Sequence, residues 1–390
     1  MPGSHAPAWE PENRGTLNLS SYFEDIEAWQ PTVNSEPDNM SSHQFLNPKP
    51  VNGCDISLYP LILKPIFKEK PWGGRRLGTL LGKNLPPGKT IGESWELAIR
   101  QEEKSVITNG PLSGKTLFEL GNARGEDLYG ISPVTGTGFP LLIKFIDAKD
   151  TLSVQVHPDD KYVLLHEDAG DSGKDEMWYI LHAEPESGIT LGLREGTTSE
   201  EIVKSLESNK PRDLQSQSRK KTCFNEIPVK EGDAFYVPAG MVHAIGRGIV
   251  LAEIQQNSDI TYRLYDWDRV DNEGKPRELH IKKALDVINY SYTNVRKLDG
   301  VTTYEGKNKK TLLLDCPSFV IELQEINQET NEETSDNFSV ISLLEGGLTI
   351  RWGAGKTDAL KGETVFIPAC LSGYRLLPDV SCRILTARVA

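Results

Sequence analysis

From about residue 59 to the C-terminus, apolar and polar positions alternate in short runs that glycine and proline interrupt. Many short runs with this punctuation predict the strands of a β-sandwich or β-barrel. The expected strands are residues 61–67, 93–99, 141–147, 152–157, 176–182, 188–193, 234–237 and 250–255. Few helices are expected. A capping box at 198–201 opens one through about residue 208, residues 281–288 form another, and residues 117–120 begin a short one.

An internal repeat sharpens this picture. Residues 232–239 read GDAFYVPA and residues 362–369 read GETVFIPA, so each copy ends an apolar strand with Pro-Ala. Residues 178–193 have a counterpart at 340–352, where Gly346 and Gly347 are expected to form a hairpin turn. Self-similarity of this kind predicts two copies of one β-barrel unit.

The predicted fold class is therefore all-β, with two jelly-roll β-barrel units and a few short helices. Residues 1–55 are polar and lack periodicity, so a flexible N-terminal extension is expected there. Residues 56–300 are assigned to a first domain and residues 301–390 to a second. His243 aligns with Gly373, and the second domain contains no histidine, so its predicted role is structural.

One strand presents polar side chains that suit a metal site. Ser153, Gln155 and His157 alternate with valines, so strand periodicity places them on one face. His243 follows a Pro/Gly turn, and Glu176 begins another predicted strand. A single histidine in a β protein is more often a packing residue than a ligand. Two histidines, a carboxylate and an amide oxygen can together hold one divalent metal.

Charged residues accompany these candidate ligands. Lys144 lies on an apolar strand, where a buried ammonium needs a partner that an anionic ligand would supply. Lys174 lies just before the candidate carboxylate ligand, and a solvated surface charge is the alternative for either lysine. Asp259 and Arg263 lie in a turn-rich connection, where an ordinary salt bridge is the alternative. Glu253 alternates with apolar neighbours, so it faces out of their packed layer.

Length and composition narrow the classes of protein. The chain has 390 residues and a formal net charge of −13, which favours two domains and argues against nucleic acid as the main partner. Five scattered cysteines without Cys-x-x-Cys spacing argue against a disulfide framework or a thiolate zinc site. No apolar run approaches the length of a membrane span, and no secretory signal pattern opens the chain. A cytoplasmic protein without membrane partners is expected.

Five motifs, in order, carry a resemblance to a known family. They are GFPLLIK (138–144), LSVQVHPDD (152–160), GKDEMWY (173–179), YVPAGMVHA (236–244) and QNSDITYRLYDWDR (256–269), with KPWGG (70–74) near the start. Together they resemble type I mannose-6-phosphate isomerase of the short bacterial kind, within the cupin superfamily. The resemblance runs from about residue 61 to the C-terminus and leaves the first 55 or so residues outside.

The resemblance implies a cupin fold and one Zn²⁺ per chain. Carried over residue by residue, it implies metal ligation by Gln155, His157, Glu176 and His243, catalytic roles for Arg263, Lys174, Glu253 and Asp259, and substrate binding by Lys144 and Ser153. No transferred motif position is substituted. The expected partner is a phosphosugar, and the expected assembly is a monomer or a weak homo-oligomer.

The implied reaction interconverts D-mannose 6-phosphate and D-fructose 6-phosphate by proton transfer through a cis-enediol. Glu253, Asp259, Lys174 and a zinc-bound water all stay open as the proton-abstracting group. The alternatives are a cupin isomerase of another phosphosugar, such as glucose 6-phosphate, or a non-catalytic sugar-binding regulatory cupin. A metal-dependent oxygenase is a third, because cupin sites also hold iron.

Overall fold

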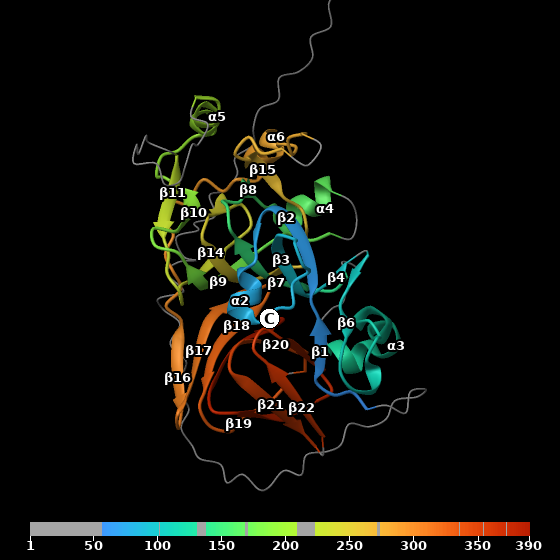
Figure 1. Ribbon diagram of the computed structural model, residues 1–390. Helices are drawn as coiled ribbons and strands as arrows, with labels where there is room; N and C mark the ends of the chain where they lie inside the picture. The colour runs from blue at the N-terminus through green and yellow to red at the C-terminus, as the bar shows by residue number, and fades with distance from the viewer. Residues whose placement is uncertain are drawn as a thin grey trace, which may run out of the picture. The chain divides into compact units, whose positions relative to one another are not determined.

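Short antiparallel strands joined by turns make up most of the chain (Figure 1), which confirms the predicted all-β class with a few short helices. The structure is a computed structural model that describes residues 57–390, except 101, 131–137, 168–170, 209–222, 271–273, 335, 354 and 372. The predicted extension, residues 1–55, lies outside the described residues.

Two sheets form the first barrel. Its six-stranded sheet has the order β12 (Ala234–Val237), β9 (Glu176–Ala183), β14 (Ile249–Gln256), β7 (Leu141–Ala148), β2 (Ile66–Gly74) and β3 (Ile91–Leu97). Its five-stranded sheet has the order β11 (Phe224–Pro228), β10 (Gly188–Leu193), β13 (His243–Ile245), β8 (Val154–Val156) and β15 (Tyr262–Tyr265). The strands predicted around the candidate ligands therefore all belong to this barrel.

Two further sheets form the second barrel. Its eight-stranded sheet has the order β16 (Val301–Glu305), β17 (Asn308–Asp315), β18 (Val320–Ile326), β25 (Cys382–Arg388), β20 (Ser339–Glu345), β23 (Thr364–Ile367), β1 (Leu61–Lys64) and β6 (Val106–Ile107). Its four-stranded sheet has the order β19 (Thr330–Glu332), β24 (Tyr374–Pro378), β21 (Gly347–Trp352) and β22 (Gly355–Leu360). A separate pair joins β4 (Ile99–Arg100) and β5 (Glu103–Lys104).

The two copies of the sequence repeat occupy equivalent strands, β12 and β23. The predicted hairpin at Gly346 and Gly347 is wrong, because β20 pairs with β23 and β25, whereas β21 pairs with β22 and β24. The chain passes there from one sheet of the barrel to the other. Gly346 has a φ of 78°, and a side chain at this corner would collide with the backbone oxygen of Ser381.

The single strand predicted over residues 61–67 is also corrected. It is broken at Pro65, which lacks an N–H group to donate to a ladder. β1, before the break, pairs with β23 of the second barrel, whereas β2, after it, pairs with β3 of the first. The domain boundary expected at residue 300 stays a prediction.

Helices are few and short among the described residues. They are α2 (Arg76–Leu81), α3 (Leu117–Tyr129), α4 (Asp160–His166), α5 (Ser199–Ser208), α6 (Ile281–Val287) and the 3-10 helix η1 (Gly110–Leu112). The capping box at Thr198 and Glu201 is present, since Glu201 N–H donates to Thr198 Oγ1 and the Glu201 carboxylate accepts from Thr198 N–H. Within the described ranges, no helix is both long enough and apolar enough to cross a membrane.

Strand β7 shows how the core positions the site. Its residues are buried on both faces, because alternate side chains enter two different layers. Leu141, Ile143 and Phe145 join the apolar cluster shared by the two barrels, whereas Lys144 and Ile146 point into the first barrel. The packing of the odd-numbered residues therefore fixes where the ammonium group of Lys144 lies.

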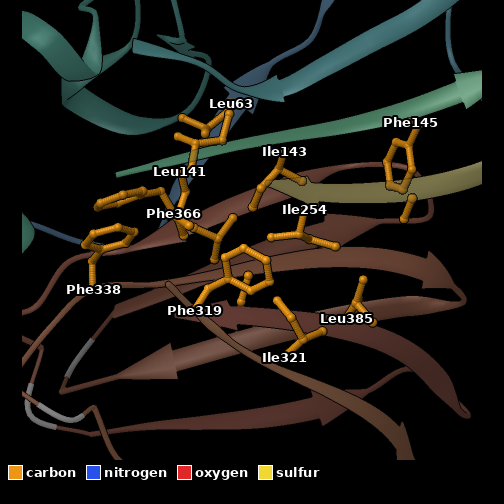
Figure 2. Packing of buried hydrophobic residues seen from close by; sticks show 14 of the residues in the cluster. Leu63, Leu141, Ile143, Phe145, Ile254, Phe319, Ile321, Phe338, Phe366 and Leu385 are labelled. Atoms are coloured by element: carbon orange, nitrogen blue, oxygen red, sulfur yellow. The ribbon is translucent and has the colours of Figure 1, made fainter. Parts of the chain in front are cut away.

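The cluster between the barrels is a sheet-on-sheet interface. Figure 2 shows Ile143 and Ile254 of the first barrel near Phe319, Ile321 and Leu385 of the second. Phe319 and Ile321 are fully buried. Burial of apolar area drives this association at roughly 25 cal/mol per Å². The six-stranded sheet, which carries Lys144, Glu176 and Glu253, is thus held rigid by packing against the second barrel.

Candidate functional site

Strand β8 and the residues on either side of it place Ser153, Gln155 and His157 on one face, as predicted. Val154 and Val156 point the other way, into an apolar cluster that they share with residues of β15 and α6. Ser153 and His157 are buried, and Ser153 Oγ donates a hydrogen bond to Gln155 Oε1 at 2.9 Å. The alternation of the sequence therefore places these groups inside the first barrel.

Both candidate histidine ligands are held by backbone carbonyls. Nδ1 of His157 lies 2.8 Å from the oxygen of Ile260, and Nδ1 of His243 lies 2.8 Å from the oxygen of Met241. A neutral ring that donates from Nδ1 keeps the Nε2 lone pair for a metal. Burial lowers the pKa of both rings, that of His157 to about 3, so both are neutral at physiological pH.

Glu176 completes this group at the start of β9. Its Oε1 lies 3.2 Å from Nε2 of His157, and its Oε2 lies 3.8 Å from Nε2 of His243. Lys174 forms an ion pair with Oε1 at 3.0 Å. Burial raises the pKa of Glu176, but Lys174, His157 and His243 together outweigh burial and hold this pKa well below its ordinary value. The carboxylate is therefore ionised beside two neutral imidazoles.

The arrangement fits a divalent metal. The ligand atoms of His157, Glu176 and His243 all lie within 4.8 Å of one another. Within the described part of the chain, Nε2 of His157 and Oε2 of Glu176 are buried without a hydrogen-bond partner, and Oε1 of Glu176 has the ion pair with Lys174 but no hydrogen bond. Such orphaned groups are costly unless something binds them. Two imidazole nitrogens and a carboxylate oxygen suit Zn²⁺, and they suit Fe²⁺ as well.

Gln155 fits less directly than the other three predicted ligands. It lies beside them, because β8 and β13 place Gln155 opposite His243. Its amide nitrogen, rather than its oxygen, faces His243, with 3.2 Å between Gln155 Nε2 and His243 Nε2. Ligation through Oε1 would require the amide to turn over and exchange its contact with Ser153. Gln155 is therefore a neighbour of the metal group whose ligation stays a prediction.

Lys144 belongs to a second polar group inside the same barrel. β7 and β14 place Lys144 opposite Glu253, and Lys144 Nζ donates to Glu253 Oε1 at 3.1 Å and to Gln255 Oε1 at 2.5 Å. Burial lowers the pKa of Lys144, but Glu253, Glu93, Asp259 and Glu176 together outweigh burial and raise this pKa above its ordinary value. Burial, followed by repulsion from Glu176, raises the pKa of Glu253.

Trp178 joins the two groups. Its Nε1 donates to Glu253 Oε2 at 3.1 Å, and its ring meets the His243 ring edge-on, with centroids 5.5 Å apart. Trp178 and Gln255 were not among the predicted site residues. The strand period could have found them, because they follow Glu176 and Glu253 by two positions and so share their faces.

Asp259 and Arg263 lie at the open side of the site. Arg263 stands opposite Gln155 in the β8–β15 ladder, so the two side chains share a face. Arg263 Nε is buried without a hydrogen-bond partner, and no ion pair joins Arg263 to Asp259 among the described residues. Burial, then Arg277, lowers the pKa of Arg263. Asp259 is exposed.

Two pockets lie on this side of the molecule. One, of about 220 Å³, has Asp259 in its wall and is lined by Trp95, Arg100, Glu103, Asp171, Asp259 and Ile260. Ile260 also supplies the carbonyl that holds His157, so this pocket adjoins the metal group. The other, of about 600 Å³, lies between α3 and β4, and its lining contains none of the predicted site residues.

Comparison with known proteins places this geometry in context. Residues 61–196 match the model for the catalytic domain of type I phosphomannose isomerase. The chain is 38% identical to mannose-6-phosphate isomerase ManA of Bacillus subtilis, over 83% of this chain and 97% of that protein. It is 35% identical to mannose-6-phosphate isomerase of Streptococcus mutans, over 82% of this chain and 96% of that protein.

A solved structure agrees with these sequence matches. The crystal structure of mannose 6-phosphate isomerase from Bacillus subtilis superposes with a TM-score of 0.75 at 31% identity. The match covers 85% of this chain and 99% of that one. The similarity therefore extends across both barrels and not only the site.

Proposed function

This chain belongs to the type I phosphomannose isomerase family, and we propose that it interconverts D-mannose 6-phosphate and D-fructose 6-phosphate. The observation that supports this most is the buried group of His157, Glu176 and His243, with orphaned ligand atoms beside the cations Lys144 and Lys174. A metal and an anionic sugar would together supply the missing partners.

His157, Glu176 and His243 would hold one Zn²⁺, with Gln155 as the fourth ligand after its amide turns. When bound, the ion supplies a Lewis acid that polarises an oxygen of the sugar. The protein contributes the rigid ligand placement. Each imidazole is fixed by a backbone carbonyl, and the carboxylate of Glu176 is kept ionised by Lys174.

Asp259 is the proposed base for the C1–C2 proton transfer. Among the described residues, it is the one carboxylate of the predicted set that accepts no hydrogen bond and forms no ion pair. Glu253 is held by Lys144 and Trp178, and Glu176 is paired with Lys174. Asp259 takes the C2 proton of the aldose, and the C1 carbonyl oxygen gains negative charge. Return of that proton to C1, with transfer of the O2 hydroxyl proton to O1, yields the ketose.

Cations surround the position where negative charge develops. Arg263 faces the site with its Nε unpartnered, so its guanidinium is placed to stabilise the enediolate oxygens. Lys144 carries three ammonium hydrogens and gives two of them to Glu253 and Gln255. The third is proposed to contact the substrate, and the ammonium also lies 5.4 Å from the centre of the Trp95 ring. Ser153, hydrogen-bonded to Gln155, is the second proposed substrate contact.

The test is a coupled isomerase assay with the zinc-loaded protein, before and after chelation and after zinc is added back. Mannose 6-phosphate should be converted, and activity should disappear with the metal and return with it. Parallel assays with glucose 6-phosphate address the alternative of another phosphosugar. Titration of each sugar by calorimetry addresses the alternative of a sugar-binding protein without catalysis.

The replacement Glu176→Gln should abolish both zinc retention and activity, because it removes the anionic ligand. A matched control is Glu329→Gln, which changes an exposed carboxylate of the second barrel. Binding of mannose 6-phosphate without conversion, in a folded zinc-loaded protein, would overturn the proposed reaction.

A further inference from the structure

The strand that carries Arg263 is an edge strand. β15 pairs with β8 on one side, where Arg263 stands opposite Gln155. Its other edge would leave the backbone N–H and C=O of Arg263 without a ladder partner. His280 meets both groups. Arg263 N–H donates to His280 Nδ1 at 3.3 Å, and His280 N–H donates to the oxygen of Arg263 at 2.8 Å.

His280 is itself anchored to a helix. It stands at the N-cap position of α6, and its carbonyl accepts the N–H of Ala284 at 2.8 Å. Ala284 is buried in the cluster that packs α6 against β8 and β15. One residue therefore ties the edge of β15 to a packed helix. Register matters at this point, because a shift of one residue would turn the guanidinium to the opposite face of the sheet.

We propose that His280 is a positioning residue for Arg263, and that its neutral imidazole locks the strand so that the guanidinium reaches the substrate. This inference rests on the role that the proposed function gives to Arg263. It adds a residue that touches neither the metal group nor the substrate. It also adds a chemical condition, because Nδ1 accepts the hydrogen bond from the Arg263 N–H only while the ring is neutral and carries its hydrogen on Nε2.

Protonation of His280 converts Nδ1 from an acceptor to a donor. Two N–H groups then face each other across the edge of β15, and the hydrogen bond to Arg263 is lost. The charged and titratable groups around this ring are Glu278, whose Oε2 lies 3.8 Å from Nε2, Arg263, Lys283, Glu167 and the ring of Tyr262. Burial lowers the pKa of His280, and Arg263 and Lys283 oppose the effects of Glu278 and Glu167. The neutral state therefore dominates at neutral pH, and the lock opens as the pH falls.

Two replacements of His280 distinguish its role as a hydrogen-bond acceptor from the effect of its protonation. His280→Asn keeps an oxygen near the position of Nδ1 but does not bind a proton, whereas His280→Leu fills the space without an acceptor. The leucine variant should lose about tenfold in kcat, the effect of one hydrogen bond. The asparagine variant should retain activity at pH 7.5. Its acid midpoint in kcat/KM should lie below that of the unmodified protein, because asparagine does not bind a proton and the next groups to titrate are carboxylates.

His182→Asn is the matched control, because His182 lies at the far end of β9 from Glu176 and its replacement should leave the pH profile unchanged. Zinc content and melting temperature are measured at each pH, so that loss of metal or of fold is seen directly. An unchanged acid midpoint in His280→Asn, or full kcat in His280→Leu, would overturn the proposal.

A second readout needs no turnover. In the unmodified zinc-loaded protein, the amide ¹⁵N–¹H signal of Arg263 should titrate with the same midpoint as the imidazole of His280. In His280→Asn it should not titrate in that range. If the Arg263 amide and the His280 imidazole titrate together but the protein has no isomerase activity, the proposed function is refuted and the role of His280 is retained. If the amide signal of Arg263 does not change when His280 is protonated, the proposed role of His280 is refuted and the proposed function is not.

Discussion

Lys144 is 4% exposed, and its replacement with methionine removes an ammonium group that donates to Glu253 and Gln255. Methionine has a similar length and leaves no cavity the size of a side chain. The charge of Glu253 then has no opposite charge in contact with it, in a barrel that also holds the ionised Glu176. Loss of one partner from a buried pair costs about 3–5 kcal/mol of unfolding free energy.

The loss of unfolding free energy in Lys144→Met should depend on pH. The pKa of Glu253 is already raised by burial and Glu176, and Lys144, followed by Lys174, opposes this rise. Without Lys144 the pKa of Glu253 in the folded protein rises further above its value in the unfolded chain. At a pH between these two values, the folded protein binds more protons than the unfolded chain. Stability then falls as the pH rises through that window. The deficit should therefore be largest near pH 8 and shrink toward pH 5.

Urea denaturation of the metal-loaded proteins measures this directly. The double replacement Lys144→Met with Glu253→Gln should recover at least half of the loss, because the amide oxygen can still accept from Trp178. A loss of unfolding free energy below about 1 kcal/mol in Lys144→Met at pH 7, with an unchanged m-value, would refute the inference that the buried pair of Lys144 and Glu253 contributes strongly to stability.

Activity distinguishes a structural lysine from a substrate-binding one. If the third hydrogen of Lys144 contacts the sugar phosphate, the double variant should be stable but show a KM raised at least tenfold, the effect of one charge-assisted hydrogen bond. The matched control is Lys83→Met, which breaks another buried pair, at 2.6 Å from Glu96, outside the proposed site. It should lose stability without a change in KM.

Three further predictions concern the metal and the second barrel. Zinc at a hundredfold excess over its Kd should raise the unfolding free energy by about 2.7 kcal/mol, and calorimetry that finds no shift would contradict binding at the orphaned group. Phe319→Ala should cost about 3–5 kcal/mol in urea denaturation while KM is retained, because Phe319 is fully buried between the barrels. Ser318→Ala should weaken zinc binding about fivefold in a competition titration with a chelator, because it removes the hydrogen bond to Asp175 Oδ2; equal affinity would show that Ser318 does not fix the metal group.

Strand periodicity predicted much of the site and could have predicted more. It placed Ser153, Gln155 and His157 on one face, and the same rule extends to Trp178 and Gln255. These are local inferences, because the period-two geometry of a strand depends only on neighbouring residues. The two sheets of each barrel follow a different rule. Which strands pair depends on residues far apart in the chain, so the expected hairpin at 346–347 proved to be a crossing between sheets.

The role of His280 could not be predicted from the sequence, because it also depends on pairing between residues far apart in the chain. It acts through backbone hydrogen bonds to Arg263, and no motif marks a residue that caps the edge of a distant strand. Its neighbours suggest only the start of a helix. Family resemblance does not help either, because it transfers positions that match known ligands and catalytic groups. Contacts of this kind become visible only when the register of the ladder is known.

The second barrel illustrates the limit of inferring function from missing ligands. Its lack of histidine predicted a structural role, yet it reaches the site through one side chain. Ser318 Oγ donates to Asp175 Oδ2 at 2.9 Å, and Asp175 Oδ1 accepts the N–H of Ala239 at 2.9 Å. Asp175 lies between Lys174 and Glu176, and Ala239 lies in the turn that leads to the second histidine ligand. Adjacent residues in an extended chain point to opposite sides, so the carboxylate that faces the second barrel fixes the one that faces the metal group. A barrel without a single ligand can therefore still set the geometry of the site.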